Sequence, residues 1–253
     1  MQTALQVSAN TAQKLWIPPI QAEPAQNHNS ELIASPWHTL IVLVIAASNA
    51  FRVAIYANHA RAGLGTSRSY LYLRTIAFEC AFLALAALGV WLRGRSLQTI
   101  FWAAMAQLGQ VFWDLGSGLA LWFVAFIVVS VLSSHSGPAD GTIAFLLPQT
   151  PMEMILWVVV SIVAGISEEA IYRGYLQRQF TALIQSVPAG VLISAAIFGG
   201  VHAYQGWSRA VVIAISAILF GAVAHWRGTV RPGMFAHGLQ DAIAPLLLKL
   251  LRH

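Results

Sequence analysis

Long apolar stretches separated by short polar connections fill the chain from residue 37 onward. Residues 37–57, 70–92 and 115–131 are each almost wholly apolar, and arginine or glycine residues lie in the connections around them. A transmembrane helix needs about 20 apolar residues, because the hydrocarbon core of a bilayer is about 30 Å thick. These stretches therefore predict membrane spans. Residues 97–114 are aromatic and amphipathic, and are expected either to span the membrane or to lie at its interface.

The residues around Thr150 predict the start of a helix. Thr150 is a suitable N-cap for a helix over residues 151–184. Pro151 fits the first helical position, and Glu153 completes a capping box. Three more helices are expected, over residues 189–203, 208–226 and 232–251. The pattern predicts an all-α fold, a polytopic transmembrane helical bundle with seven or eight spans.

The same pattern divides the chain into three parts. Residues 1–36 are polar and contain several prolines, so they are expected to form a flexible N-terminal tail. Residues 37–150 hold the N-terminal transmembrane helices. Residues 151–253 form a helical core that carries most of the candidate chemistry described below.

The composition predicts a membrane protein and excludes several kinds of binding site. Hydrophobic residues make up 58% of the chain and charged residues 9%, whereas soluble domains carry about 25% charged residues. The net charge of +5 comes mainly from arginines in short connections, which set the orientation of membrane proteins and do not indicate nucleic-acid binding. The single cysteine, Cys80, excludes an intrachain disulfide and a cysteine-based metal site. We expect an integral multi-pass protein of a cell inner membrane or an endoplasmic-reticulum-type membrane.

Two adjacent carboxylates, Glu168 and Glu169, follow the apolar run 155–166 in a chain with only nine acidic residues. A charged side chain at the bilayer centre costs at least about 2.5–3.5 kcal/mol, so function is the first interpretation. Glu169 and Arg173 are four residues apart and can pair on one helix face. Glu168 points about 100° away around the helix and would be free to act as a general base. Alternatively, both glutamates only end the helix at the membrane surface.

Two other pieces of the last third carry histidines with a partner four residues away: Phe198 with His202, and His237 with Asp241. Helices 151–184 and 189–203 should form an antiparallel hairpin, which puts Glu168 and His202 within about 6 Å in height. His237 fits this site less well, because the next helix carries the chain about 28 Å back. Either the turn before that helix lies inside the membrane body, beside a water-filled cavity, or the helices tilt strongly.

These three pieces together resemble the CPBP family, which comprises type II CAAX prenyl endopeptidases and the Abi or bacteriocin-processing proteins. The family pattern is two adjacent glutamates with an arginine four after the second, a phenylalanine with a histidine four later, and a histidine with an asparagine or aspartate four later. The resemblance covers about residues 152–251. It implies an intramembrane endopeptidase, with a CPBP-like catalytic helical core over residues 151–253.

The resemblance also implies roles for individual residues. The residue matching Glu168 is taken to activate water, with the position of His202 assisting. The positions of His237 and Asp241 are taken to bind the oxyanion, although an ionised aspartate cannot donate the hydrogen bond that an asparagine donates. Asp241 must then be protonated or orient His237. The positions that shape the site are Glu169, Arg173 and Phe198.

A zinc site is the main mechanistic alternative. His202, His237 and Glu168 would make a set of two histidines and one carboxylate with an open position, and members of the family have been described both as metalloproteases and as glutamate-dependent enzymes. The chain has no His-Glu-x-x-His motif. We expect a glutamate-dependent mechanism without a cofactor.

The expected partners are the lipid bilayer and a membrane-bound protein or peptide, cut near a lipidated C-terminus or elsewhere, and no nucleic acid. Two other function classes remain open. One is a non-catalytic immunity or scaffold protein with the same fold. The other is a proton-coupled transporter that uses Glu79, Asp114 and the glutamate pair, with Arg74 close to Glu79 in the sequence; internal pairing explains Arg74 and Glu79 equally well.

Overall fold

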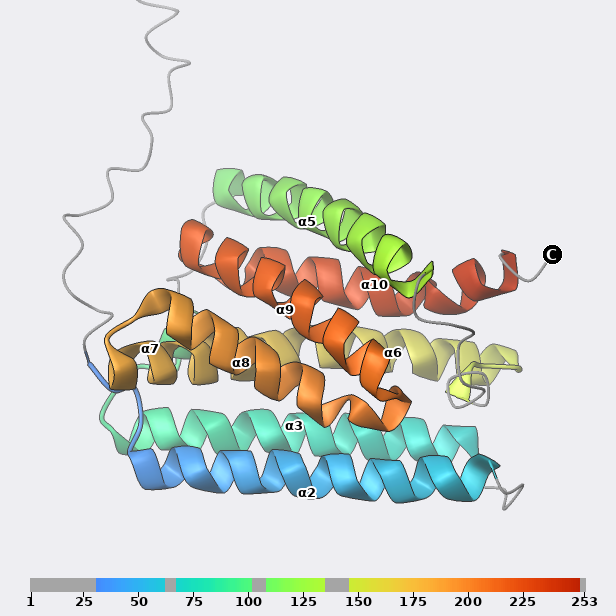
Figure 1. Ribbon diagram of the computed structural model, residues 1–253, viewed down its shortest axis with the longest axis horizontal. Helices are drawn as coiled ribbons and strands as arrows, with labels where there is room; N and C mark the ends of the chain where they lie inside the picture. Colours follow the sequence, from blue (N-terminus) through green and yellow to red (C-terminus); the bar gives the residue numbers. More distant parts are fainter. Residues whose placement is uncertain (1–30, 62–66, 102–107, 135–145, 251–253) are drawn as a thin grey trace, which may run out of the picture.

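The computed structural model describes residues 31–61, 67–101, 108–134 and 146–250, and within them every regular element is helical (Figure 1). The predicted all-α bundle is confirmed. The elements in chain order are α2 (Pro36–Arg61), α3 (Arg68–Leu92), α4 (Gln98–Phe101), α5 (Leu108–Ser134), α6 (Pro151–Glu169), the π-helix η2 (Ala170–Gln177), α7 (Arg178–Ile184), α8 (Val187–Val201), the 3₁₀ turn η3 (Ala203–Gln205), α9 (Trp207–Arg227) and α10 (Arg231–Leu250).

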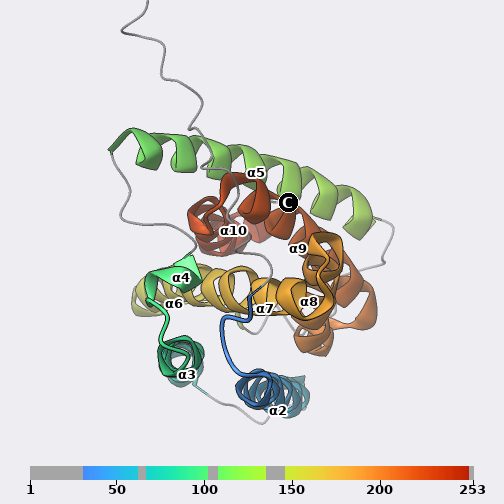
Figure 2. The same cartoon turned by 90° about the vertical axis from the view of Figure 1, so that its left-hand side faces the viewer.

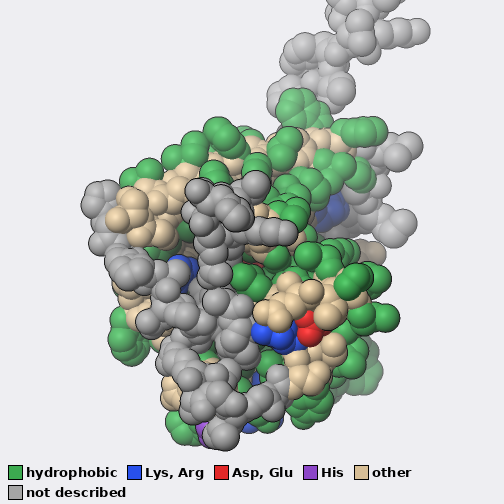
Figure 3. Space-filling view, turned by 90° about the vertical axis from the view of Figure 1, so that its right-hand side faces the viewer, with side chains coloured by type: hydrophobic (Ala, Val, Ile, Leu, Met, Phe, Trp, Pro, Cys, Tyr) green, Lys and Arg blue, Asp and Glu red, His purple; other side chains and the backbone are tan. Residues whose placement is uncertain are grey.

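Five helical stretches of the described residues are long and apolar enough to cross a membrane: Pro36–His59, Arg68–Leu92, Gly109–Ser134, Pro151–Ile184 and Trp207–Arg227. The shorter apolar helix α8 and the final helix α10 complete the bundle. At the end of the bundle drawn in Figure 3, many of the described side chains are hydrophobic, and the charged ones form small separate groups. This is an integral, multi-pass membrane protein.

The central element is the continuous helix formed by α6, η2 and α7. Figures 1 and 2 show α10 and α5 stacked on one side of it, and α2 and α3 on the other. α10 packs against both α5 and α6, α3 packs against α6, and α8 pairs with α9. A polar side chain of α6 can therefore face either α10 on one side or α2 and α3 on the other.

The start of this central helix is the predicted capping box. The Thr150 side chain accepts a hydrogen bond from the backbone N–H of Glu153 at 3.2 Å, and the Glu153 carboxylate accepts one from the Thr150 N–H at 3.2 Å. The π-helical segment Ala170–Gln177 was not predicted. It begins directly after the glutamate pair, and such segments occur frequently at functional sites.

Some predicted boundaries were wrong. The predicted span 115–131 begins too late: α5 starts at Leu108, so Asp114 lies inside this helix. There Asp114 pairs with Arg227 of α9 at 3.1 Å and with Arg231 of α10 at 2.5 Å. These pairs join the ends of three helices, a structural role that the transporter alternative did not anticipate. Residues 1–30 of the predicted tail and 135–145 of the predicted loop lie outside the described residues.

Two side chains of the central helix hold the beginning of α2. The Gln179 side chain accepts hydrogen bonds from the N–H groups of Ile33 and Ala34 at 3.0 and 3.2 Å, and donates one to the Ala34 carbonyl at 2.9 Å. The Tyr175 hydroxyl lies 2.8 Å from His38 Nδ1. Because all of these groups are buried, each bond satisfies a polar atom that water does not reach.

Candidate active site

Glu169 is the most enclosed residue of the glutamate pair, with no exposed surface. Its Oε1 accepts a hydrogen bond from Arg173 Nη1 at 2.8 Å, so the predicted pairing is present. The same oxygen lies 3.1 Å from His237 Nδ1. Glu169 thus fixes the orientation of the His237 ring while it neutralises a buried guanidinium.

Glycines let the helices approach closely enough for this contact. A Cβ atom built on Gly233 of α10 would lie only 2.6 Å from Glu169 Oε2, and one on Gly165 of α6 would lie 2.8 Å from the Gly238 nitrogen. Small residues at a helix interface permit such close packing in membranes. The neighbouring Arg173 guanidinium lies 4.6 Å from the centroid of the Phe198 ring, which supplies a cation–π contact. The α10 side of the site is therefore rigid and densely packed.

Glu168 lies in a different environment. Like Glu169 Oε2, its Oε2 is buried and has no hydrogen-bond partner among the described residues, and the nearest cationic group is His237 Nε2 at 3.7 Å. The side chain nevertheless keeps 16% of its surface exposed, because it lines an internal cavity. A carboxylate with unused acceptor capacity beside a space for water or substrate is suited to take up a proton.

This cavity has a volume of about 180 Å³ and lies between α2, α3, α6 and the end of α8. Its polar lining residues are Asn49, Tyr56, Arg74, Thr75, Glu79, Glu168, Tyr172, His202 and Tyr204, and its apolar ones are Ala46, Ala50, Val53, Ala57, Leu71, Phe78, Phe82, Leu146 and Val201. The transmembrane helices α2 and α3 thus form one wall, and the glutamate and histidine motifs of the core form the other.

His202 reaches the cavity from the C-terminal end of α8. Its Nδ1 lies 2.8 Å from the carbonyl oxygen of Phe198, four residues earlier. A carbonyl can only accept, so Nδ1 carries the hydrogen and Nε2 of the neutral ring has a lone pair. His202 can therefore accept a hydrogen bond from water at Nε2. The predicted proximity of Glu168 and His202 is met, since both line the same cavity.

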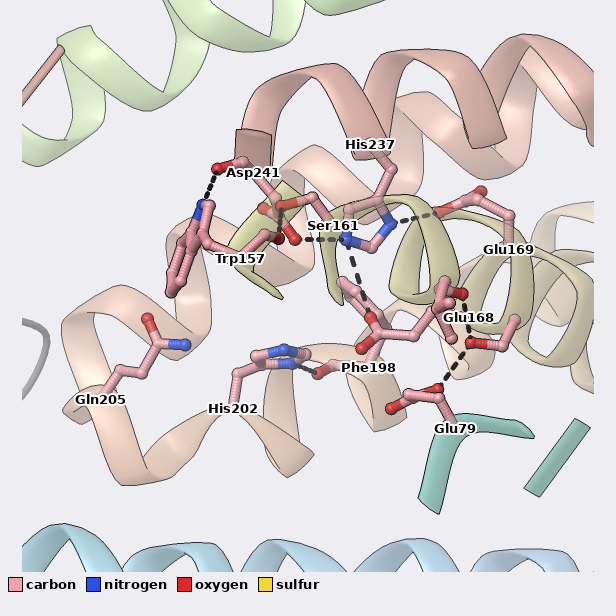
Figure 4. Close-up of polar contacts among 12 residues, drawn as sticks. Glu79, Trp157, Ser161, Glu168, Glu169, Phe198, His202, Gln205, His237 and Asp241 are labelled. Carbon is pink, nitrogen blue, oxygen red and sulfur yellow. Dashed lines mark hydrogen bonds and ion pairs between the residues drawn. The ribbon is translucent and has the colours of Figure 1, made fainter. Parts of the chain in front are cut away.

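His237 and Asp241 approach Glu168 from α10 (Figure 4). Asp241 Oδ2 lies 3.5 Å from His237 Nε2, an ion-pair distance with no hydrogen bond between the two side chains. Asp241 is 40% exposed, and its backbone carbonyl accepts a hydrogen bond from Trp157 Nε1 at 2.8 Å. Three carboxylates, those of Glu168, Glu169 and Asp241, thus surround the His237 ring within 3.7 Å.

The position of His237 was the uncertain point of the sequence prediction. Figure 1 shows that α9 crosses the bundle obliquely, so it carries the chain less far along the bundle axis than an upright helix would. Strong tilt was one of the two alternatives considered. The turn that precedes α9 also lies beside the cavity, which its residue Tyr204 lines. Burial raises the pKa of Tyr204 to about 12, so its hydroxyl keeps its proton and can donate.

Glu79 of α3 is a site residue that the motif search did not find. Its Oε2 lies 2.7 Å from the hydroxyl of Ser167, the residue directly before the glutamate pair, and it lines the cavity with Glu168. The sequence marked Glu79 only as a transporter candidate or as a partner for Arg74. The structure gives the two residues different partners: Arg74 stacks on Tyr56, 4.5 Å from its ring centroid. A contact across 88 residues has no local sequence signal.

The donors for the zinc alternative are not gathered. Among the described residues, no three His, Cys, Asp or Glu side chains are placed to hold one metal ion. His237 uses Nδ1 for Glu169 and His202 uses Nδ1 for a backbone carbonyl, so Nε2 is the nitrogen that each ring has left for another ligand. As placed, His202, His237 and Glu168 are not gathered around one ion, and we derive no step through zinc.

Comparison with known proteins assigns the C-terminal part of the chain. Residues 150–243 match the family model described as type II CAAX prenyl endopeptidase, Rce1-like. This region is therefore similar to the type II CAAX prenyl endopeptidases. The match begins at the N-cap of α6 and includes all three motifs in α6, α8 and α10, so the family resemblance seen in the sequence is confirmed. No curated protein and no solved structure matches the chain.

Proposed function

We propose that this protein is an intramembrane endopeptidase of the CAAX type, which hydrolyses a peptide bond in a membrane-associated substrate with Glu168 as the general base. The observation that carries the proposal is the different placement of the two glutamates. Glu169 has no exposed surface and its Oε1 is held by Arg173 and His237, whereas Glu168 lines a cavity shared with His202. The family match of residues 150–243 supports the same activity.

In the proposed reaction, a water molecule in the cavity donates one hydrogen bond to Glu168 and another to His202 Nε2. Glu168 takes a proton from this water as its oxygen attacks the scissile carbonyl, and a tetrahedral oxyanion forms. The protonated Glu168 then gives the proton to the leaving nitrogen, and the carbon–nitrogen bond breaks. The carboxylate is regenerated, so neither a cofactor nor a covalent intermediate is needed.

His237 is the proposed oxyanion donor. In its protonated form both ring nitrogens donate: Nδ1 to Glu169, and Nε2 into the space between Glu168 and Asp241. A donor held in advance where charge develops is the most effective form of transition-state stabilisation. Asp241 can only accept when ionised, so its proposed role is to favour and orient the protonated His237. This role resolves the difference from the asparagine of the family pattern.

The proposed substrate reaches the site within the membrane. α2 and α3, two membrane-spanning helices, form the outer wall of the cavity, and its lining between the polar groups is apolar. A membrane peptide or the lipidated C-terminal end of a protein is compatible with such a wall. The expected location is a cell inner membrane or an endoplasmic-reticulum-type membrane.

Proteolysis by the purified full-length protein in detergent tests this function. A fluorogenic farnesylated CAAX peptide and a mixed library of membrane peptides would be incubated with wild type, with Glu168→Gln, and with wild type plus a zinc chelator. Glu153→Gln is a matched control, because Glu153 lies on the same helix but only caps its start. We expect cleavage by wild type, by the control and in the presence of chelator, and none by Glu168→Gln.

Each other result is informative. Equal cleavage by wild type and Glu168→Gln would exclude Glu168 as the base. Loss of cleavage with chelator, restored by added zinc, would favour the metalloprotease alternative. A cellular function that survives Glu168→Gln would favour a non-catalytic immunity or scaffold protein.

A further inference from the structure

Arg74 is a cation in the cavity wall that has no counter-ion among the described residues. Its guanidinium stacks on the ring of Tyr56, which also lines the cavity. Its Nε is buried and donates to nothing, and among the described residues no carboxylate lies within ion-pair distance of it. An arginine inside a membrane segment is costly, and arginines at such depth usually pair. Arg74 therefore has donor capacity directed at a ligand.

The contact with Tyr56 leaves the hydrogen-bond donors of Arg74 available, and this indicates which type of ligand Arg74 can bind. Arg74 Cζ lies over the Tyr56 ring, a contact that uses none of the guanidinium N–H groups as hydrogen-bond donors to the described residues. Two such N–H groups match the two oxygens of a carboxylate, which arginine binds with parallel hydrogen bonds. Arg74 is also the only Lys or Arg side chain among the residues that line the cavity. An anionic group that enters the cavity consequently has one cationic position to occupy.

The walls of the cavity favour an extended peptide over a small anion. The α2 wall consists mainly of small residues at helical spacing, Ala46, Ala50 and Val53 together with Asn49. The α3 wall adds Leu71 and Phe78. A chain with small or apolar side chains fits this lining, while a hydrated inorganic anion gains nothing from it.

The spacing along α3 sets the distance between the cation and the reactive groups. Arg74 precedes Glu79 by five residues, a rise of about 7.5 Å, and Glu79 is joined to the residue before Glu168 by the Ser167 hydrogen bond. An extended peptide advances about 3.3 Å per residue. A carboxylate bound at Arg74 would thus lie about two or three residues from the bond positioned at Glu168.

We propose that Arg74 is a substrate-binding residue, which selects peptides that carry a carboxylate two or three residues from the scissile bond. This inference rests on the proposed protease function, since it takes Glu168 as the position of the reaction. Two sources supply the same chemistry: the C-terminal carboxylate of the substrate, or an aspartate or glutamate side chain. Arg74 touches the substrate but takes no part in the proton transfers.

Direct binding tests the inference without the need for turnover. The full-length protein in detergent would be titrated with three probes: N-acetyl-Val-Leu-Leu as the free acid, the same peptide as its C-terminal amide, and N-acetyl-Val-Leu-Glu as its C-terminal amide. Wild type should bind the free acid at least about tenfold more tightly than the first amide, the order expected for one charge-assisted contact. Tight binding of the glutamate-containing amide would identify a side-chain carboxylate as an equivalent source; weak binding would identify the C-terminus.

Variants locate the effect. Arg74→Gln should abolish the preference for the acid, and Arg74→Lys should keep part of it, because the charge remains while the bidentate geometry is lost. Arg93→Gln is the matched control: Arg93 caps the other end of the same helix and is exposed, so the preference should be unchanged. Retention of part of the preference by Arg74→Lys also rules out misfolding as the cause of the loss.

Three results would overturn the inference: equal binding of acid and amide by wild type, no binding of any probe at millimolar concentration, or an acid preference that survives Arg74→Gln. Failure of the protease function gives a different pattern. Cleavage of the farnesylated peptide and the peptide library would then be absent in every variant, while the binding preference and its dependence on Arg74 would remain.

Discussion

The two sides of α6 differ in whether they are closely packed or open to a cavity. On the α10 side, Glu169 is fully buried, and Arg173 and His237 occupy its Oε1 at 2.8 and 3.1 Å. On the side of α2 and α3, Glu168 opens onto a cavity of about 180 Å³. Neighbouring residues of one helix thus have opposite environments.

This difference shows how one helix can combine stability with reactivity. Glycines at 165 and 233 bring α6 and α10 into close contact, which leaves no room for water on that side. The helices α2 and α3 lie farther out, with mainly small side chains on the α2 face that lines the cavity. The packed side fixes the position of the His237 ring, and the open side admits the reactants. Stability and activity should therefore respond differently to the same chemical change on the two sides.

The sharpest test exchanges each glutamate for its amide. Glu169→Gln should lower the free energy of unfolding by about 3–5 kcal/mol, because it leaves the buried Arg173 guanidinium without its counter-charge. Glu168→Gln should leave stability unchanged or raise it, while cleavage falls by about 10²–10⁴-fold. Unfolding in a denaturing detergent, together with the peptide assay, measures both quantities. Equal destabilisation by the two substitutions would contradict the difference in environment between Glu168 and Glu169.

A second test loosens the attachment of α2 to the core. Gln179→Leu removes three hydrogen bonds to Ile33 and Ala34 and leaves their buried N–H and C=O groups unsatisfied, at a cost of about 2–4 kcal/mol. Hydrogen exchange should increase at the beginning of α2 and remain slow in α6 and α10. Gln185→Leu is the control, because Gln185 caps the end of α7 and its side chain donates to the Ala182 carbonyl three residues earlier. Uniform exchange throughout the protein would contradict a separate attachment of α2.

A third test adds one methyl group to the packed side. Gly233→Ala places a Cβ 2.6 Å from Glu169 Oε2, so the helices must move apart or the carboxylate must shift. We expect a loss of about 1–3 kcal/mol in stability and a change in the environment of the His237 ring, observable by NMR. In contrast, Gly200→Ala should be neutral or stabilising, because a Cβ there meets no atom within 4 Å. A neutral Gly233→Ala would show that the interface is looser than the glycine contacts indicate.

The smallest effect is expected for a substitution at the start of α6, far from Glu168 and Glu169. Thr150→Ala removes half of the capping box at the start of α6 and should cost about 1 kcal/mol. Catalysis should be unchanged, since Thr150 is more than four helical turns from Glu168. Thr150→Ser retains the cap and serves as the control. A loss of activity larger than the loss of stability would mean that the position of the whole helix controls the site.

Local sequence rules predict a large part of the fold and some features of the candidate site. The capping box, the Glu169–Arg173 pair and the extent of the helix over 151–184 each depend on residues within four positions of one another, or on a continuous apolar run. The nearness of Glu168 and His202 followed from helix rise and a short hairpin turn. The division into residues 1–36, 37–150 and 151–253 and the individual site roles stay predictions, as does the absence of a cofactor.

Other features required the tertiary structure. The place of His237 depends on the tilt of α9, which side-chain packing sets and hydropathy does not encode. The Glu79–Ser167 contact depends on the register between α3 and α6, which no residue spacing within one helix reveals. The place of Arg74 in the cavity wall, with no carboxylate partner among the described residues, depends on it too. The sequence by itself determined the membrane bundle, the motifs and their family, because those follow from periodicity and local geometry. Only the tertiary structure placed His237 against Glu169 and Glu168 in the wall of a cavity, because those contacts depend on distant helices.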